Sequence, residues 1–282
     1  MASLFSGLED LGLGKLSEDL EVYETKEVPQ KNNGTSSAEV IEFQEADILF
    51  DKTMTCPVCE QTIKAKTVKA GRLKLLGADT DLRPRYKDVD SLKYDAIVCP
   101  RCGYAALRRF FDYITAGQAK AIKEKISSTF KGISQENEVY SYDDAITRHK
   151  LALVNAIVKN AKLSERAYIC LKTAWLCRGK RETLPEDTKD YELVKDELQK
   201  AELDFINKAF LGFKDAFVKE SFPMCGMDES TCTYLVAELA RRSGEFEEAS
   251  RWVSRVLFDR AANDRLKERA RDIKELIQKK ER

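Results

Sequence analysis

Residues 55–59 read Thr-Cys-Pro-Val-Cys, and residues 99–104 read Cys-Pro-Arg-Cys-Gly-Tyr. In each segment two residues separate two cysteines, so one tight turn can direct both sulfurs at a single cation, and the two turns together supply four thiolates. The proline after the first cysteine of each pair fixes φ near the value of such a turn. The pattern therefore predicts a tetrahedral metal site whose ligands are Cys56, Cys59, Cys99 and Cys102.

The residue after each cysteine pair bears on the quality of the turn. Gly103 can adopt the positive φ that lets backbone N–H groups approach the sulfurs, whereas Glu60 occupies the matching position after the first pair and makes that turn less favourable. Four protein ligands leave no open coordination position, so the pattern favours a structural Zn²⁺ over a catalytic one. Iron in a rubredoxin-like site of four thiolates has the same geometry and stays the closest alternative.

The gap between the pairs is thirty-nine residues long, whereas a compact zinc ribbon has a gap of roughly fifteen to twenty residues. The gap must therefore contain structure of its own. Residues 62–68 and 93–98 have the composition of strands that carry the pairs, and residues 77–81 and 83–85 have the composition of loops. We expect a zinc ribbon with a long loop or an extra hairpin.

Charge is unevenly distributed, although the 48 basic and 48 acidic residues cancel. Residues 1–50 contain 3 basic and 11 acidic residues, and residues 51–131 contain 17 and 9. A basic ribbon can contact phosphates, but no run of aromatic residues accompanies these bases, so nucleic-acid binding is only an alternative. The basic positions are Lys64, Lys66, Lys69, Arg72, Lys74, Arg83, Arg85, Arg108 and Arg109.

The N-terminal part, residues 1–45, is acidic and is expected to be largely flexible, with a polar linker over residues 18–40. Ahead of the linker, apolar residues recur at roughly helical spacing between glycines. They predict either a terminus that packs on its own protein or a short docking peptide. These residues are Leu4, Phe5, Leu8, Leu11 and Leu16.

Helical periodicity begins at Thr115. Ser141 is expected to cap a helix over residues 142–159, and Ser164 to cap the next one. Further helices are expected over residues 188–219, 229–243 and 246–258, followed by a charged terminal helix. The expected apolar face of the 142–159 helix consists of Ile146, Leu153, Val154, Ile157 and Val158.

Residues 234–249 resemble a tetratricopeptide unit, because Gly244 lies at the turn and Ala249 follows five residues later. No regular period of about thirty-four residues runs through the region, so a compact bundle is favoured over a long solenoid. The predicted fold class is α+β and mostly α. A zinc-ribbon domain is expected over residues 46–114 and a tetratricopeptide-like helical domain over residues 115–282.

The remaining cysteines and the single histidine suggest no catalytic site. Cys170 and Cys177 lie seven residues apart on one helix face and are expected to be buried, whereas a redox or second metal role for Cys225 and Cys232 stays open. His149 is expected to be a packed or surface residue. Because no phosphate-binding loop or nucleophile elbow is present, the chain is not expected to be an enzyme.

The chain begins without a secretory signal, and charges interrupt every apolar stretch before it reaches the length of a membrane span. We therefore expect a cytoplasmic protein. Disulfides seldom persist in a reducing cytosol, which further favours metal ligation by the cysteine pairs.

Taken together, the cysteine pairs, residues 174–178 and residues 234–244 resemble the bacterial family called domain of unknown function 2225. Glu60 and the lack of a clear proline before Tyr94 are small departures. The resemblance implies a ribbon followed by helical repeats, with the four cysteines as recurrent metal ligands, and it implies no reaction. The preferred hypothesis is a zinc-binding adaptor for a protein or peptide partner, with nucleic-acid binding and a rubredoxin-like iron or thiol redox role as alternatives.

Overall fold

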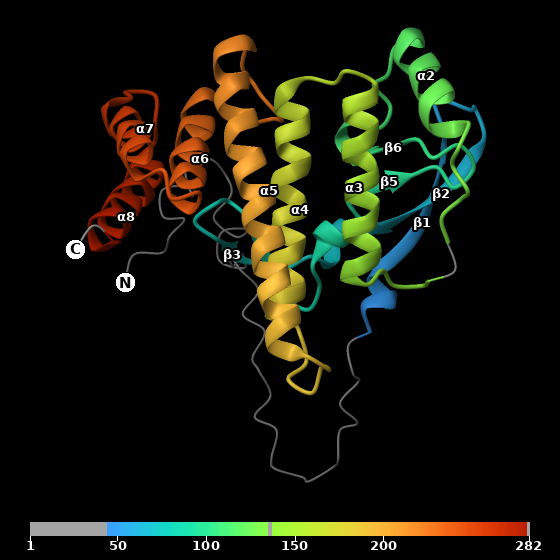
Figure 1. Ribbon diagram of the computed structural model, residues 1–282, viewed down its shortest axis with the longest axis horizontal. Helices are drawn as coiled ribbons and strands as arrows, with labels where there is room; N and C mark the ends of the chain where they lie inside the picture. The colour runs from blue at the N-terminus through green and yellow to red at the C-terminus, as the bar shows by residue number, and fades with distance from the viewer. Residues whose placement is uncertain (1–43, 135–136, 281–282) are drawn as a thin grey trace, which may run out of the picture. The chain divides into compact units, whose positions relative to one another are not determined.

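Three short antiparallel hairpins precede a series of helices (Figure 1). The computed structural model describes residues 44–134 and 137–280, so the predictions for residues 1–43 lie outside the described residues. The strands pair only within each hairpin, as three two-stranded sheets. The pairs are β1 (Leu49–Thr55) with β2 (Thr62–Val68), β3 (Leu75–Ala78) with β4 (Pro84–Tyr86), and β5 (Ala96–Val98) with β6 (Ala105–Leu107).

The gap between the cysteine pairs contains the extra hairpin. The expected strand over residues 62–68 is confirmed, whereas the strand expected over residues 93–98 begins only at Ala96, after a 3₁₀ turn. The loop assignment of residues 77–81 and 83–85 is partly wrong, because Gly77 pairs with Arg85 and Ala78 with Pro84. Glycine and proline are common in loops, but here they lie at the end of a short hairpin, where few ladder hydrogen bonds are required.

The helices lie side by side in chain order, which the short connections favour. Helix α3 packs on α4 and on β5 and β6, α4 packs on α5, and α6 packs on α5 and on α7 (Figure 1). Every residue of α4 from Ile169 to Gly179 is buried, so α4 lies at the centre of the main apolar core. The helices are α2 (Ala116–Ile122), α3 (Tyr142–Val158), α4 (Leu163–Glu182), α5 (Tyr191–Lys219), α6 (Glu229–Arg242), α7 (Phe246–Phe258) and α8 (Asp264–Lys280).

The two predicted N-caps have different outcomes. Ser141 caps α3 as expected, since its side chain accepts from the Asp144 N–H in a capping box. Ser164 does not cap α4, because it lies inside the first turn of a helix that begins at Leu163. There, Glu220 accepts from the Ser164 hydroxyl at 2.5 Å and from its N–H at 3.2 Å. A carboxylate from beyond the end of α5 therefore takes the capping role.

The predicted apolar face of α3 is also partly wrong. Ile146 is buried, but the side chains of Val154 and Ile157 are 49% and 55% exposed. The face that packs on β5 and β6 contains small and polar residues instead, among them Ala152, Ala156 and Asn155. Small side chains let a helix approach a hairpin closely, and periodicity that counts only large apolar residues misses such a face.

The last helical pair follows the prediction closely. Helices α6 and α7 meet at Gly244, which has a φ of 84°, and Ala249 is fully buried at the contact. Cys170 and Cys177 are buried, as expected. No described helix is both long and apolar enough to cross a bilayer. Contacts group residues 43–282 in one compact unit, so a division into ribbon and helical domains stays a prediction.

Candidate metal centre

Both cysteine pairs lie in the turns of hairpins, and the two turns have the same backbone hydrogen bonds. In the turn between β1 and β2, the Cys56 N–H donates to the Gln61 backbone carbonyl at 2.9 Å, and the Glu60 N–H donates to the Cys56 carbonyl at 2.8 Å. In the turn between β5 and β6, the Cys99 N–H donates to Tyr104 at 2.8 Å and the Gly103 N–H donates to Cys99 at 3.1 Å. The structure therefore places two equivalent cysteine turns opposite each other.

The four predicted ligands come together. The sulfur of Cys56 lies 3.6 Å from that of Cys102, and the sulfur of Cys59 lies 3.6 Å from that of Cys99. All four sulfurs lie within 4.8 Å of one another. A tetrahedral zinc site with Zn–S bonds of about 2.3 Å needs sulfurs about 3.8 Å apart. The cluster can hold a metal ion and is compatible with zinc.

The backbone after each pair adopts the left-handed conformation that the turn requires. Gly103 has a φ of 74°, as predicted, and Glu60 has a φ of 62° at the matching position. Only glycine adopts this region without a steric cost, so Glu60 is held there by its turn. The less favourable residue predicted after the first cysteine pair therefore lies in the left-handed region, as expected.

The electrostatics of the cluster favour a bound cation. Contacts with Cys102 and then with Cys56 lower the pKa of the Cys99 thiol, whereas contacts with Cys56 and Cys99 raise the pKa of Cys102. Because four thiolates this close repel one another strongly, complete deprotonation requires a metal ion to offset their charge.

The second turn is fastened to the helical region. Asn155 of α3 donates to the Gly103 carbonyl at 3.0 Å, and the Ser127 hydroxyl donates to the Cys102 carbonyl at 2.8 Å. Phe130 packs so closely that a Cβ on Gly103 would lie 2.7 Å from its ring. A separate apolar cluster, which includes Val58, Ile97, Tyr104, Phe111 and Ile122, surrounds the sulfurs. The metal centre is therefore part of the packing between ribbon and helices.

The predicted basic patch is dispersed over several structural contacts. Arg83 and Arg85 form ion pairs with Glu182, and Arg108 donates to the backbone carbonyls of Lys66 and Tyr94. Arg109 donates to the carbonyl of Cys225, Lys66 pairs with Asp51, and Lys69 donates to Asp47. Within residues 44–134 and 137–280, only Lys64, Arg72 and Lys74 of the nine make no ion pair or hydrogen bond through their side chains.

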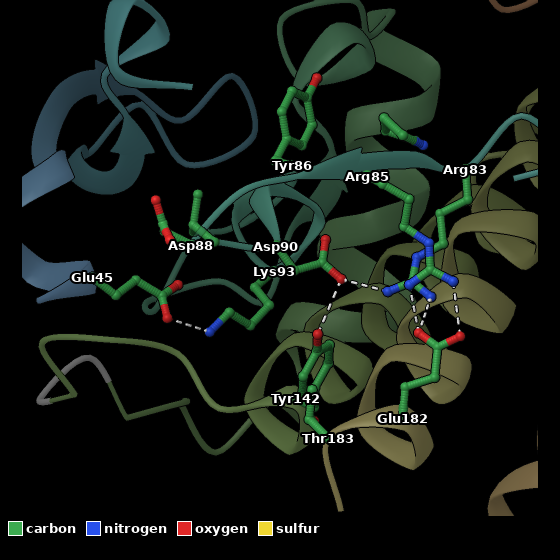
Figure 2. A pocket seen from close by; sticks show the side chains of 12 residues that line it. Glu45, Arg83, Arg85, Tyr86, Asp88, Asp90, Lys93, Tyr142, Glu182 and Thr183 are labelled. Atoms are coloured by element: carbon green, nitrogen blue, oxygen red, sulfur yellow. Dashed lines mark hydrogen bonds and ion pairs between the residues drawn. The ribbon is translucent and has the colours of Figure 1, made fainter. Parts of the chain in front are cut away.

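Figure 2 shows the cavity beside β4, which has a volume of about 340 Å³. The polar groups that line it pair with one another. Lys93 forms an ion pair with Glu45 at 2.7 Å, and the Tyr142 hydroxyl donates to the Asp90 carboxylate at 3.1 Å. The Arg83 guanidinium, whose side chain is only 3% exposed, pairs with Asp90 at 2.9 Å. These contacts hold the gap region against the beginning of α3 and the end of α4.

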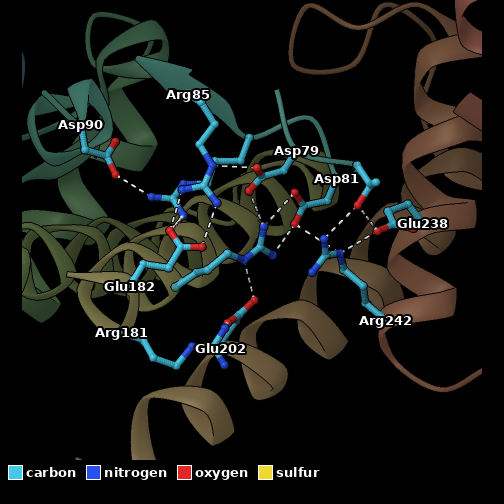
Figure 3. A network of polar contacts seen from close by, with 12 residues as sticks. Asp79, Asp81, Arg85, Asp90, Arg181, Glu182, Glu202, Glu238 and Arg242 are labelled. Carbon is cyan, nitrogen blue, oxygen red and sulfur yellow. Dashed lines mark hydrogen bonds and ion pairs between the residues drawn. The ribbon is translucent and has the colours of Figure 1, made fainter. Parts of the chain in front are cut away.

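Sequence reasoning missed a second network, between the β3–β4 turn and three helices (Figure 3). Arg178 of α4 forms ion pairs with Asp79 at 2.9 Å, with Asp81 at 2.5 Å and with Glu202 of α5 at 2.7 Å. Asp81 is fully buried. Burial alone would raise the pKa of Asp81, but Arg178 and then Arg242 hold that pKa below its ordinary value. The sequence carries no local signal for this network, because Arg178 lies shortly before the charged residues 180–182.

The remaining candidate residues are packed groups. His149 is fully buried with its Nδ1 2.8 Å from the Ala145 carbonyl, and burial lowers its pKa to about 4, so the ring is neutral. Burial raises the pKa of Cys225 and of Cys232 to about 12, which keeps both thiols protonated and poorly nucleophilic. Across the described part of the chain, the four cysteines are the one group of three or more potential ligands close enough for a metal.

Comparison with known proteins places these features in a wider group. A family model described as an uncharacterized protein conserved in bacteria, DUF2225, matches residues 49–277, a span that contains both cysteine turns and the helices through most of α8. No curated protein and no solved structure matches the chain.

Proposed function

The chain belongs to the bacterial family DUF2225, and we propose that it is a cytoplasmic adaptor in which a structural zinc ion fixes the ribbon to a helical region that binds a protein or peptide partner. Under this proposal the metal is bound by Cys56, Cys59, Cys99 and Cys102, and the chain has no catalytic role. Zinc supplies cross-linking of the two turns rather than chemistry, because four thiolates leave no coordination position for water or substrate.

The observation that carries the proposal is the attachment of the second cysteine turn to α3 and to the segment after α2. Asn155, Ser127 and Phe130 all contact the turn through its backbone or at Gly103. A redox site needs no such fastening, whereas a structural site gains from it, because metal binding then stabilises the packing of the whole region.

The positions of the basic residues support a protein partner over nucleic acid. Phosphate binding needs free cations, and most of the predicted basic residues already contact carboxylates or carbonyls of the chain. The helical region packs its helices side by side in chain order, and we infer that this compact bundle, like a tetratricopeptide unit, presents the surface that binds a peptide.

Metal analysis and one substitution test the structural role. We expect about one zinc per chain in protein purified without added metal, and iron in its place would support the redox alternative. Replacing Cys99 with serine should release the metal and expose residues 46–112 to proteases while α6 and α7 keep their helical content. Cys225→Ser, which alters a cysteine outside the cluster, serves as the control and should behave like the wild type.

The partner class is tested by affinity capture with nuclease-treated extracts and with the Cys99→Ser chain in parallel. A protein that binds the intact chain and binds again as purified components supports the adaptor. If binding instead disappears with nuclease treatment and falls steeply between low and moderate salt, the chain is a nucleic-acid-binding protein.

A further inference from the structure

The turn between β3 and β4, residues 79–82, contacts side chains of α4 and α6, and we call it the tip (Figure 3). On the helical side, Arg178, Tyr234, Glu238 and Arg242 contact the tip, and Glu202 of α5 pairs with Arg178 beside them. We call these five residues the tip site. Both are made of polar groups that lie far apart in sequence. The tip is therefore bound to the helices much as a short peptide would be.

The tip is recognised through its side chains and its backbone. Arg178 donates to both oxygens of Asp81, at 3.0 and 2.5 Å. The Thr80 hydroxyl donates to Glu238 at 2.6 Å and accepts from Arg242 at 2.9 Å. The Tyr234 hydroxyl donates to the Thr80 carbonyl at 2.6 Å. Bidentate arginine contacts of this kind select planar carboxylates, and the remaining contacts select a hydroxyl between them.

The charges of the helical side and of the tip are complementary. Four arginines on the helices, Arg178, Arg181, Arg241 and Arg242, interact with only two helical carboxylates, Glu202 and Glu238. The helical side alone thus has two positive charges in excess, and the two carboxylates of the tip balance them. One of the two, Asp79, is also held by Arg85 of its own hairpin at 2.7 Å.

An open cavity of about 380 Å³ adjoins the tip site and shares Glu202 and Arg242 with it. Arg181 and Arg241 line this cavity above an apolar floor of Leu203 and Ile206, and the Leu203 side chain is 45% exposed. A second chain segment can therefore reach the arginines while the tip is still in place.

Apart from the tip, the hairpin is held to the helices through Arg83 and Arg85. Its sheet has only two strands, and the side chains of Leu75 and Leu76 are 60% and 65% exposed. Two-stranded hairpins have little stability of their own. Both arginines pair with Glu182, which is 36% exposed.

We propose that the tip site recognises an acidic turn of a partner protein, with a hydroxyl residue between two carboxylates, and that Asp79, Thr80 and Asp81 occupy it in cis until such a turn displaces them. The inference rests on the proposed adaptor function and names the chemistry of its partner. The incoming segment binds first at Arg181 and Arg241 and then replaces the tip carboxylates at Arg178 and Arg242. Because each carboxylate that leaves is replaced, Arg178 is never buried without an anion, a state that is strongly unfavourable.

A labelled synthetic peptide of residues 77–85, Gly-Ala-Asp-Thr-Asp-Leu-Arg-Pro-Arg, tests the proposal by fluorescence anisotropy with the full-length protein. The double variant Asp79→Asn/Asp81→Asn should bind this peptide about tenfold more tightly than the wild type, because its own tip no longer competes. Binding should weaken as salt is added, and a peptide with asparagine at both positions should not bind. A folded double variant that binds no more tightly than the wild type overturns the proposal.

If the double variant does not fold, the single variant Asp79→Asn replaces it, because this variant leaves Asp81 paired with Arg178. Its affinity for the peptide should increase by less than that of the double variant. The matched control is Asp88→Asn, which removes an exposed carboxylate of the same gap region and should bind like the wild type. Among the described residues, the one ion pair of this carboxylate is with Lys87, at 3.9 Å. Equal gains in this control and in the tip variants overturn the assignment of the tip.

Hydrogen exchange of the wild type supplies an independent measurement. Saturating peptide should accelerate amide exchange of residues 79–82, and unchanged exchange with peptide bound overturns displacement. Zinc content is determined on the same preparations. Missing metal would count against the proposed function, whereas a failed titration with full zinc content would count only against the tip site.

Discussion

At the scale of single residues, the two cysteine turns can be compared directly, because they share one backbone conformation. They have different residues at its left-handed position. Glu60 and Gly103 have φ values of 62° and 74°. We predict that Glu60→Gly increases the free energy of unfolding by about 0.5–1 kcal/mol, since glycine removes the steric cost of the left-handed region and loses only part of that gain to chain entropy. Denaturant unfolding of metal-loaded protein measures the change.

The reverse substitution is the control. Gly103→Ala should lower the free energy of unfolding by about 1–3 kcal/mol, because its Cβ meets the Phe130 ring at 2.7 Å in addition to the strained φ. A destabilised Glu60→Gly protein would show that the Glu60 side chain contributes more to the first turn than its backbone costs.

The sequence predicts which residues form a site together when those residues lie close to one another in the chain. Two residues between cysteines, and a glycine after the second pair, define the metal turns without knowledge of the rest of the fold. Arg178 and Asp81 are 97 residues apart, and no local pattern joins them. Their pairing depends on where the gap hairpin lies, which spacing within the hairpin does not determine.

At the scale of elements, α4 receives its N-terminal cap from the residue that follows α5. Glu220 accepts from both the N–H and the hydroxyl of Ser164. We predict that Glu220→Ala lowers the free energy of unfolding by about 1 kcal/mol and increases amide exchange in the first turn of α4, because the cap and its favourable charge at the helix N-terminus are lost. Chemical unfolding and hydrogen exchange measure the two effects.

Glu247→Ala provides the matched control, because the Glu247 side chain is 92% exposed and makes one distant ion pair within α7. Its effect on stability should be within about 0.5 kcal/mol of zero. Equal losses in the two variants would contradict the capping role of Glu220.

Periodicity and capping residues predict where the helices begin and end. Which face of each helix is buried depends on the elements that pack against it. The 142–159 prediction differs from α3 by one residue, yet Val154 and Ile157 of its expected apolar face are exposed. Ala152 and Ala156 let one face of α3 pack closely on the β5–β6 hairpin, while α4 also packs on the helix. The extra hairpin was likewise expected from the length of the gap, but its contacts were not.

At the scale of the whole molecule, the Arg178 network joins the gap hairpin to three helices. We predict that Asp81→Asn lowers the free energy of unfolding at neutral pH by about 3–5 kcal/mol, because it leaves part of a buried arginine charge unbalanced. Arg178 and Arg242 hold the pKa of Asp81 below its unfolded value despite burial. Such a carboxylate contributes stability that is complete above the unfolded pKa, about 4, and is lost as the pH falls toward the folded pKa.

The stability difference between wild type and Asp81→Asn should therefore be constant from about pH 7 to about pH 5 and should shrink below about pH 4. Urea unfolding of both proteins across this range measures it. Acid also releases metal from thiolates, but this loss affects both proteins and cancels in the difference. A difference that stays constant down to about pH 3 would show that Asp81 contributes little through its charge.

The position of the gap hairpin between the two cysteine turns has a consequence for biosynthesis. Both turns are complete once Cys102 has left the ribosome, so the metal can close the ribbon early. Arg242, which binds the tip, follows roughly 140 residues later. At about 5–20 residues per second, roughly seven to thirty seconds pass between the completion of the ribbon and the synthesis of the last helical residue that binds the tip. During this interval the order of translation, not the stability of the native contacts, determines which cations the tip can meet.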